Sequence, residues 1–156
     1  MSLRVGVFLD ISNLYHGARA VYKSKINYKE LLNFVEQNVG KVSVAKAYGA
    51  QVTDEAEPFI RLLQKFGYTP VYKKAKQYGN KIKGDIDTLL TVDVIRHLEE
   101  FDLFFLGSAD ADFLPLIDYL LEKEKKVMVM GCQISHAFKD RADIACEIHR
   151  GLLCGS

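Results

Sequence analysis

The sequence has no apolar run that approaches the length of a membrane span. It also has no Pro/Gly/Ser-rich linker, no low-complexity tract and no internal repeat. Its 156 residues, 49% of them hydrophobic, suffice for one sizeable core but not for two ordinary domains. These absences predict a soluble, cytoplasmic protein in which residues 1–156 form a single domain.

Charge of one sign and paired cysteines are also missing. The formal net charge of +1 excludes a globally basic nucleic-acid binder but leaves room for a local basic patch. The three cysteines form no C-x-x-C pair, which argues against a zinc site or a disulfide framework. No G-x-G-x-x-G motif and no P-loop follow the first apolar run, so a dinucleotide-binding oxidoreductase and a P-loop nucleotide site are disfavoured.

What the sequence does contain is an alternation of short apolar runs and helical patterns. We expect strands at residues 5–9, 42–48, 69–74, 103–106 and 127–130. Helices are expected at residues 12–23, 54–66, 86–98 and 112–123, with one more after a capping box formed by Asn27 and Glu30. Strands that alternate with helices predict an α/β protein, a three-layer α/β/α sandwich with a mainly parallel sheet of about five strands.

Acidic residues follow two of these strands and occupy a third segment, the helix that enters the fourth strand. In open parallel sheets, ligands bind beyond the carboxyl ends of the strands. Taken singly, each acid has a structural explanation, such as a helix cap or a turn. Together they need a cation, and a site with only oxygen ligands suits Mg²⁺ or Mn²⁺. The expected metal ligands are Asp10, Asp87, Asp93, Asp110 and Asp112.

A basic segment precedes that helix. Residues 72–84, YKKAKQYGNKIKG, contain five lysines and two tyrosines but no acid. Lysines neutralise phosphates and tyrosine rings stack on unpaired bases, so we expect a loop that binds single-stranded RNA. The alternative is a solvated lysine loop without a ligand. The residues assigned to RNA binding are Lys73, Lys74, Lys76, Tyr78, Lys81 and Lys83.

Three short motifs carry a resemblance to a known family. They are Asp10-x-x-Asn13, Lys83-Gly84 followed by Asp87 and Asp93, and Ser108-x-Asp110-x-Asp112-Phe113. In this order they resemble the NYN domain, a branch of the PIN-like nuclease superfamily that includes the LabA-like proteins. The resemblance runs from about residue 5 to residue 131 and implies a Rossmann-like PIN fold and metal-dependent cleavage of RNA. The sequence departs from the family at Lys83-Gly84-Asp85-Ile86-Asp87, where one extra residue leaves either Asp85 or Asp87 for the usual acid; spacing to Asp93 favours Asp87.

The function expected from these residues is a metal-dependent ribonuclease that cleaves phosphodiester bonds in single-stranded RNA. Asp10 and Asp110 are expected to ligate Mg²⁺ or Mn²⁺ directly, Asn13 to orient the nucleophile or a phosphate oxygen, and Ser108 to hold a neighbouring carboxylate. Two alternatives stay open: a non-catalytic PIN-like module that binds RNA or protein, and a metal-dependent phosphatase. The sequence also leaves a homodimer open.

Overall fold

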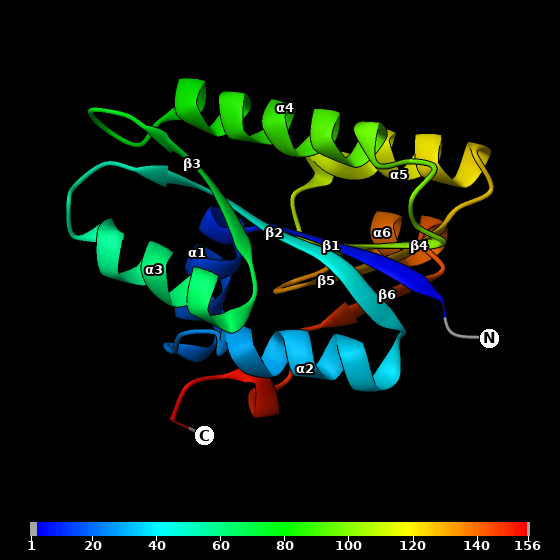
Figure 1. Ribbon diagram of the computed structural model, residues 1–156, viewed down its shortest axis with the longest axis horizontal. Helices are drawn as coiled ribbons and strands as arrows, with labels where there is room; N and C mark the ends of the chain where they lie inside the picture. Colours follow the sequence, from blue (N-terminus) through cyan, green and yellow to red (C-terminus); the bar gives the residue numbers. More distant parts are fainter. Residues whose placement is uncertain (1–2, 156) are drawn as a thin grey trace.

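The computed structural model describes residues 3–155, in which a parallel β-sheet separates two layers of helices (Figure 1). The sheet has six strands in the order β3-β2-β1-β4-β5-β6, and every neighbouring pair is parallel. The expected α/β sandwich is therefore confirmed. The strands are β1 (Arg4–Asp10), β2 (Lys41–Gln51), β3 (Thr69–Lys74), β4 (Leu103–Gly107), β5 (Lys126–Gly131) and β6 (Ile144–Glu147).

The sixth strand corrects the expected number of about five. β6 has only four residues, and Ile144 is 51% exposed, so it lacks the continuous apolar run that marks β1, β4 and β5. The short helix α6 (His136–Arg141) before it was also not predicted, since six residues give little helical periodicity.

The two helix layers follow from the side to which each crossover turns. One face of the sheet is covered by α1 (Ile11–Tyr22), α2 (Tyr28–Asn38) and α3 (Ala56–Phe66), and the other by α4 (Asn80–Arg96), α5 (Leu114–Glu122) and α6 (Figure 1). Short 3-10 turns, η1 (Ala111–Phe113) and η2 (Arg150–Leu152), complete the chain. None of the helices within residues 3–155 is both long enough and apolar enough to cross a membrane.

β1 lies at the centre of the sheet and is buried on both sides. Val5, Val7 and Leu9 face the layer formed by α1–α3, whereas Phe8 packs with Phe104 in the core under α4–α6. This alternation is that of a strand covered by helices on both faces, and it explains why β1 reads as a continuous apolar run. Its last residue, Asp10, is consequently carried into a buried position.

The topology also determines where polar residues converge. The chain leaves β1 towards β2 on one side of the sheet, and it leaves β4 towards β5 on the other side. Because β1 and β4 are neighbours, their carboxyl ends form the topological switch point of the sheet, the place where open α/β sheets bind ligands. Asp10 ends β1 here, and Ser108 and Asp110 follow β4 here.

The helix α4 begins six residues earlier than expected. Its buried stripe is Ile82, Ile86, Leu90 and Val94, so the first turn is stabilised by Ile82, which is 5% exposed. The sequence did not predict this turn as helical, because glycine is unfavourable within helices and Gly84 lies among charged residues. Residues 72–84 are therefore not one loop: they comprise the end of β3, a linker at 75–79 and the first turns of α4.

Candidate active site

Three carboxylates converge at the switch point. One oxygen each from Asp10, Asp87 and Asp110 lies within 4.8 Å of the other two. Asp10 comes from the end of β1, Asp110 from the segment after β4, and Asp87 from α4. Segments far apart in the sequence thus bring three negative charges to one point.

Asp10 is fixed in place by the two segments that flank it. It is 4% exposed and caps α1: its Oδ1 accepts a hydrogen bond from the backbone N–H of Asn13 at 3.3 Å, and its Oδ2 accepts one from the Ser108 hydroxyl at 3.2 Å. Burial raises the pKa of Asp10 to about 6, although these two hydrogen bonds act in the opposite direction. The charges of Asp87 and Asp110 add to the increase in this pKa.

Asn13 and Ser108 connect the β1 end to the β4 end. The side-chain Oδ1 of Asn13 accepts a hydrogen bond from the backbone N–H of Ala109 at 2.9 Å, and the hydroxyl oxygen of Ser108 accepts one from the N–H of Asp110 at 3.1 Å. Asp110 then caps the turn η1 by accepting from the N–H of Asp112 at 2.9 Å. The two polar residues therefore hold the carboxylate-bearing segments together.

Lys83 reaches into the acidic group from the first turns of α4. Its ammonium lies 2.6 Å from Asp110 Oδ2, 3.1 Å from Asp87 Oδ2 and 3.2 Å from Asp112 Oδ2. These contacts raise the pKa of Lys83, Asp110 contributing most. The pKa of Asp87 is nevertheless raised, because its desolvation outweighs the effect of Lys83. Since the Lys83 side chain is 38% exposed, solvent screens part of its attraction.

The chemistry of the group fits a divalent cation. Asp10, Asp87, Asp110 and Asp112 supply four carboxylates against the single ammonium of Lys83, so negative charge predominates. Carboxylate oxygens are hard ligands of the kind that Mg²⁺ and Mn²⁺ prefer. Asp10, Asp87 and Asp110 are the residues placed to hold such an ion, whereas the side chain of Asp112 is 73% exposed at the rim.

Asp93 lies apart from this group. It accepts a hydrogen bond from the Tyr48 hydroxyl at 2.7 Å and forms an ion pair with Lys46 at 3.4 Å. Asp93 follows Asp87 by six residues, about 1.7 turns of α4, so its side chain points in a different direction, towards β2 and away from the switch point. An acid on an apolar helix stripe thus has a tyrosine and a lysine as partners, which the sequence alone did not indicate.

The predicted RNA-binding residues occupy four different settings. Lys73, the second-last residue of β3, pairs with Asp85 at 3.0 Å, while Lys83 belongs to the acidic group. Tyr78 lies in the linker, 43% exposed, with its ring centroid 6.1 Å from that of His16. The others, which we call the unpaired lysines, have no ion pair within residues 3–155: Lys74, Lys76 and Lys81.

The position of Lys83 inside the acidic group was not anticipated from the sequence. A signal for it exists, since Lys83 and Asp87 are four residues apart and such a pair shares one face of a helix. That signal could be used only if the helix was known to begin before residue 83. Because the helix was expected to begin only at residue 86, Lys83 was not predicted to share a helix face with Asp87.

The fold and the site together define the class of protein: a parallel α/β domain with convergent carboxylates at its switch point, an arrangement compatible with PIN-like nucleases. The NYN domain model matches residues 4–148, and the chain belongs to the NYN domain family. This confirms the resemblance seen in the three sequence motifs.

Two further proteins are similar to this chain. The low amplitude and bright protein LabA of Synechococcus elongatus is 23% identical over 138 residues, which cover 82% of this chain and 73% of LabA. A crystal structure of a protein of unknown function, VPA0982 from Vibrio parahaemolyticus, is 27% identical. It superposes with a TM-score of 0.84 over 97% of this chain and 96% of its own.

Proposed function

We propose that this protein is a metal-dependent ribonuclease that hydrolyses phosphodiester bonds in single-stranded RNA. The observation that carries the proposal is the convergence of Asp10, Asp87 and Asp110 within 4.8 Å at the switch point of the sheet. Burial raises the pKa values of Asp10 and Asp87, and repulsion from the neighbouring carboxylates adds to the increase, so a bound cation would stabilise the charged group. Membership of the NYN family, which is associated with PIN-like nucleases, supports the same chemistry.

The residues of the site divide into ligands and supports. Asp10, Asp87 and Asp110 would hold Mg²⁺ or Mn²⁺, which when bound supplies Lewis-acid stabilisation of the charge that develops on the phosphate. Ser108 keeps Asp10 in place through its hydroxyl. The Oδ1 of Asn13 is already engaged by Ala109, so the amide N–H donors of Asn13 are the atoms that can bind a phosphate oxygen.

Lys83 would act as a fixed positive charge beside the metal ligands. Its ammonium contacts Asp87, Asp110 and Asp112, and a phosphate that enters the site meets this ammonium together with the cation. A preorganised cation at this point favours the charge of the transition state. The unpaired lysines would hold the RNA backbone at greater distance, through contacts that depend on salt concentration.

One observation also favours a second function, a non-catalytic module that binds RNA. Lys83 already supplies one positive charge within contact distance of three of the carboxylates. A lysine in this position can lower the need for a metal ion. The assay must therefore separate RNA binding from RNA cleavage.

The test uses a fluorescently labelled single-stranded RNA with Mg²⁺, with Mn²⁺ or with EDTA. Wild-type protein is expected to cleave only with metal, and Asp10→Asn to slow cleavage at least about a hundredfold, equivalent to about 2.7 kcal/mol. Asp140→Asn, which removes the same charge from an exposed position on α6, is the matched control and should cleave normally.

Three results would contradict the proposal. RNA binding without cleavage under either metal would favour the binding module. Equal loss of activity in Asp140→Asn would mean that total charge, not the site, controls cleavage. Hydrolysis of a phosphate monoester in place of RNA would identify a phosphatase.

A further inference from the structure

A large cavity lies beside the acidic group, on the face of the sheet covered by α1, α2 and α3. Its volume is about 730 Å³, within the range of about 300–1,000 Å³ that is usual for small-molecule sites. Asp10, Asp87, Asp110 and Asp112 do not line it. We propose that this cavity binds an unpaired nucleobase of the RNA whose phosphate lies at the acidic group.

Residues that line the cavity are neighbours in sequence of Asp10 and of its partner in the sheet. Ile11 and Ser12, which line it, directly follow Asp10. On the neighbouring strand, Tyr48 pairs with Asp10 in register, and the next two residues, Gly49 and Ala50, also line the cavity. A nucleotide with its phosphate at Asp10 therefore has the cavity within reach of its base. This step rests on the proposed function, because it places the phosphate at the carboxylates.

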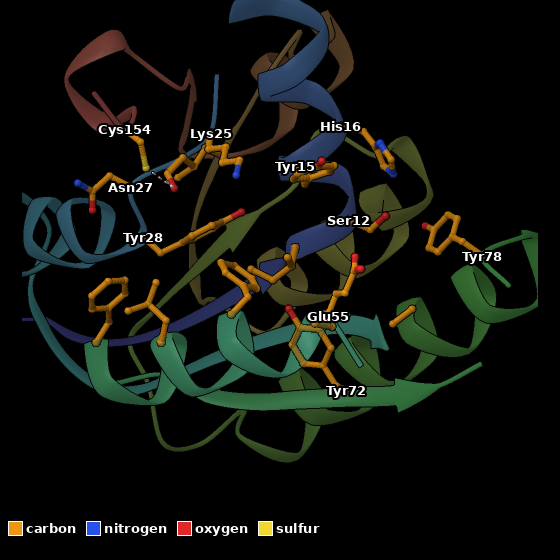
Figure 2. A pocket seen from close by; sticks show the side chains of 18 residues that line it. Ser12, Tyr15, His16, Lys25, Asn27, Tyr28, Glu55, Tyr72, Tyr78 and Cys154 are labelled. Carbon is orange, nitrogen blue, oxygen red and sulfur yellow. Dashed lines mark hydrogen bonds between the residues drawn. The ribbon is translucent and has the colours of Figure 1, made fainter. Parts of the chain in front are cut away.

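Aromatic rings dominate the interior and the rim. Figure 2 shows Tyr28 and Tyr72 directed towards the middle of the cavity. At the rim the ring of His16 lies 5.3 Å from Tyr15 and 6.1 Å from Tyr78, measured between centroids. Tyr15 and Tyr78 are 42% and 43% exposed, although large aromatic side chains are usually more buried. Exposed rings next to a phosphate site are the feature by which proteins bind unpaired bases.

The hydroxyl of Tyr72 offers the cavity a polar group that can bind a ligand. Its oxygen is buried and has no hydrogen-bond partner within the described residues. Gly49 permits this placement, because a Cβ on Gly49 would lie 2.5 Å from the Tyr72 ring. A buried hydroxyl without a partner costs free energy in the unliganded protein. The edge of a base, which carries both donors and acceptors, can supply the missing partner.

Polar groups in the cavity also suit a base better than an apolar ligand. Figure 2 shows the Glu55 carboxylate pointing into the same space as the Tyr72 hydroxyl, and Ser12 on the side nearer to Tyr78. A carboxylate accepts hydrogen bonds from ring N–H and amino groups of bases but repels phosphate. The base is thus favoured inside the cavity, and the phosphate is favoured outside it.

The test measures binding of two labelled decamers in EDTA, one of cytidines and one of abasic ribose phosphates, by fluorescence anisotropy. Tyr72→Phe removes only the unpartnered hydroxyl, and Ala56→Phe fills the cavity from the start of α3. Ala20→Phe, at an exposed position of α1 outside the cavity, is the matched control.

We expect wild-type protein to bind the cytidine decamer more tightly than the abasic one by about tenfold or more, the contribution of a stacked base. Ala56→Phe should remove this difference, Tyr72→Phe should reduce it without lowering the melting temperature, and Ala20→Phe should keep it. If Ala56→Phe fails to fold, Tyr72→Phe still decides the matter. Equal binding of both decamers by wild-type protein, or unchanged discrimination in Tyr72→Phe, would overturn the proposal.

The two proposals can fail separately. Base discrimination that depends on Tyr72, without any cleavage under Mg²⁺ or Mn²⁺, would support the cavity and reject the nuclease. Metal-dependent cleavage that is indifferent to Tyr72→Phe and Ala56→Phe would support the nuclease and reject the cavity.

Discussion

The carboxylate of Asp10 should make the metal-free protein less stable as the pH rises. Burial raises the pKa of Asp10 from 3.8 to about 6, so the folded state retains a proton that the unfolded chain releases. Between about pH 4 and pH 6 the unfolded chain therefore binds fewer protons, and the free energy of unfolding falls as pH increases. The cost is complete above the folded pKa, and at about 1.4 kcal/mol per pKa unit it approaches about 3 kcal/mol.

Asp10→Asn removes this cost because the amide does not ionise. Asparagine can still accept the hydrogen bond from Asn13 N–H, but the bond from Ser108 loses its charged acceptor, at about 1 kcal/mol. In EDTA at pH 8 we expect the variant to be more stable than wild type by about 1–2 kcal/mol. At pH 4.5 the gain should vanish. Urea unfolding at several pH values, followed by circular dichroism, measures the difference.

Two comparisons make the assay decisive. Asp102 has the opposite behaviour: Arg4 lowers its pKa to about 2, so its stabilisation is present above about pH 4 and is lost as pH falls towards the folded pKa. Asp102→Asn should therefore not gain stability at pH 8. Saturating Mg²⁺ should reverse the order for Asp10, since a ligand at a hundred times its Kd adds about 2.7 kcal/mol to wild type only. A pH-independent difference between wild type and Asp10→Asn would refute the reasoning.

Three further outcomes follow from the side-chain contacts. Lys83→Ala should tighten Mg²⁺ binding about tenfold in calorimetry while lowering kcat, because the ammonium competes with the ion but also binds phosphate; weaker Mg²⁺ binding would contradict this. Asp93→Leu should destabilise the protein by about 1–3 kcal/mol in thermal melts by leaving the Tyr48 hydroxyl unsatisfied, with Mg²⁺ affinity unchanged; a loss of Mg²⁺ affinity would return Asp93 to the metal site. Replacing the unpaired lysines together by alanine should flatten the salt dependence of RNA binding, each lost phosphate contact lowering the log-log slope by up to about 0.7; an unchanged slope would exclude these lysines from the interface.

The layered α/β/α fold could be predicted from the sequence because the hydrophobic patterns that indicate it are local. A strand buried on both faces, such as β1, must be a short continuous apolar run, and this pattern does not depend on distant residues. Strands alternating with helices then leave few topologies, since parallel crossovers have one preferred hand. β6 was not predicted because none of its four residues is buried, so they carry no such pattern.

Only part of the candidate site could be predicted from the sequence. Asp10 and Asp110 follow strands directly, and strand ends converge in any parallel sheet, so their approach could be predicted without coordinates. Asp87 and Asp93 share a helix, and their separation of six residues does not say which of them faces the strand ends. Only the rotation of α4 against the sheet places Asp87 with Asp10 and turns Asp93 towards Tyr48.

The sequence by itself determined the order of the first five strands and of the helices between them, and it placed acids after two of these strands. Both follow from hydrophobic periodicity, which is a property of the chain as written. The tertiary structure alone decided three matters: the start of α4, the insertion of Lys83 among the carboxylates, and the aromatic cavity beside them. Each depends on side chains distant in sequence, as when residues from Ile11 to Cys154 enclose one space. Packing, not local pattern, determines which of these residues meet.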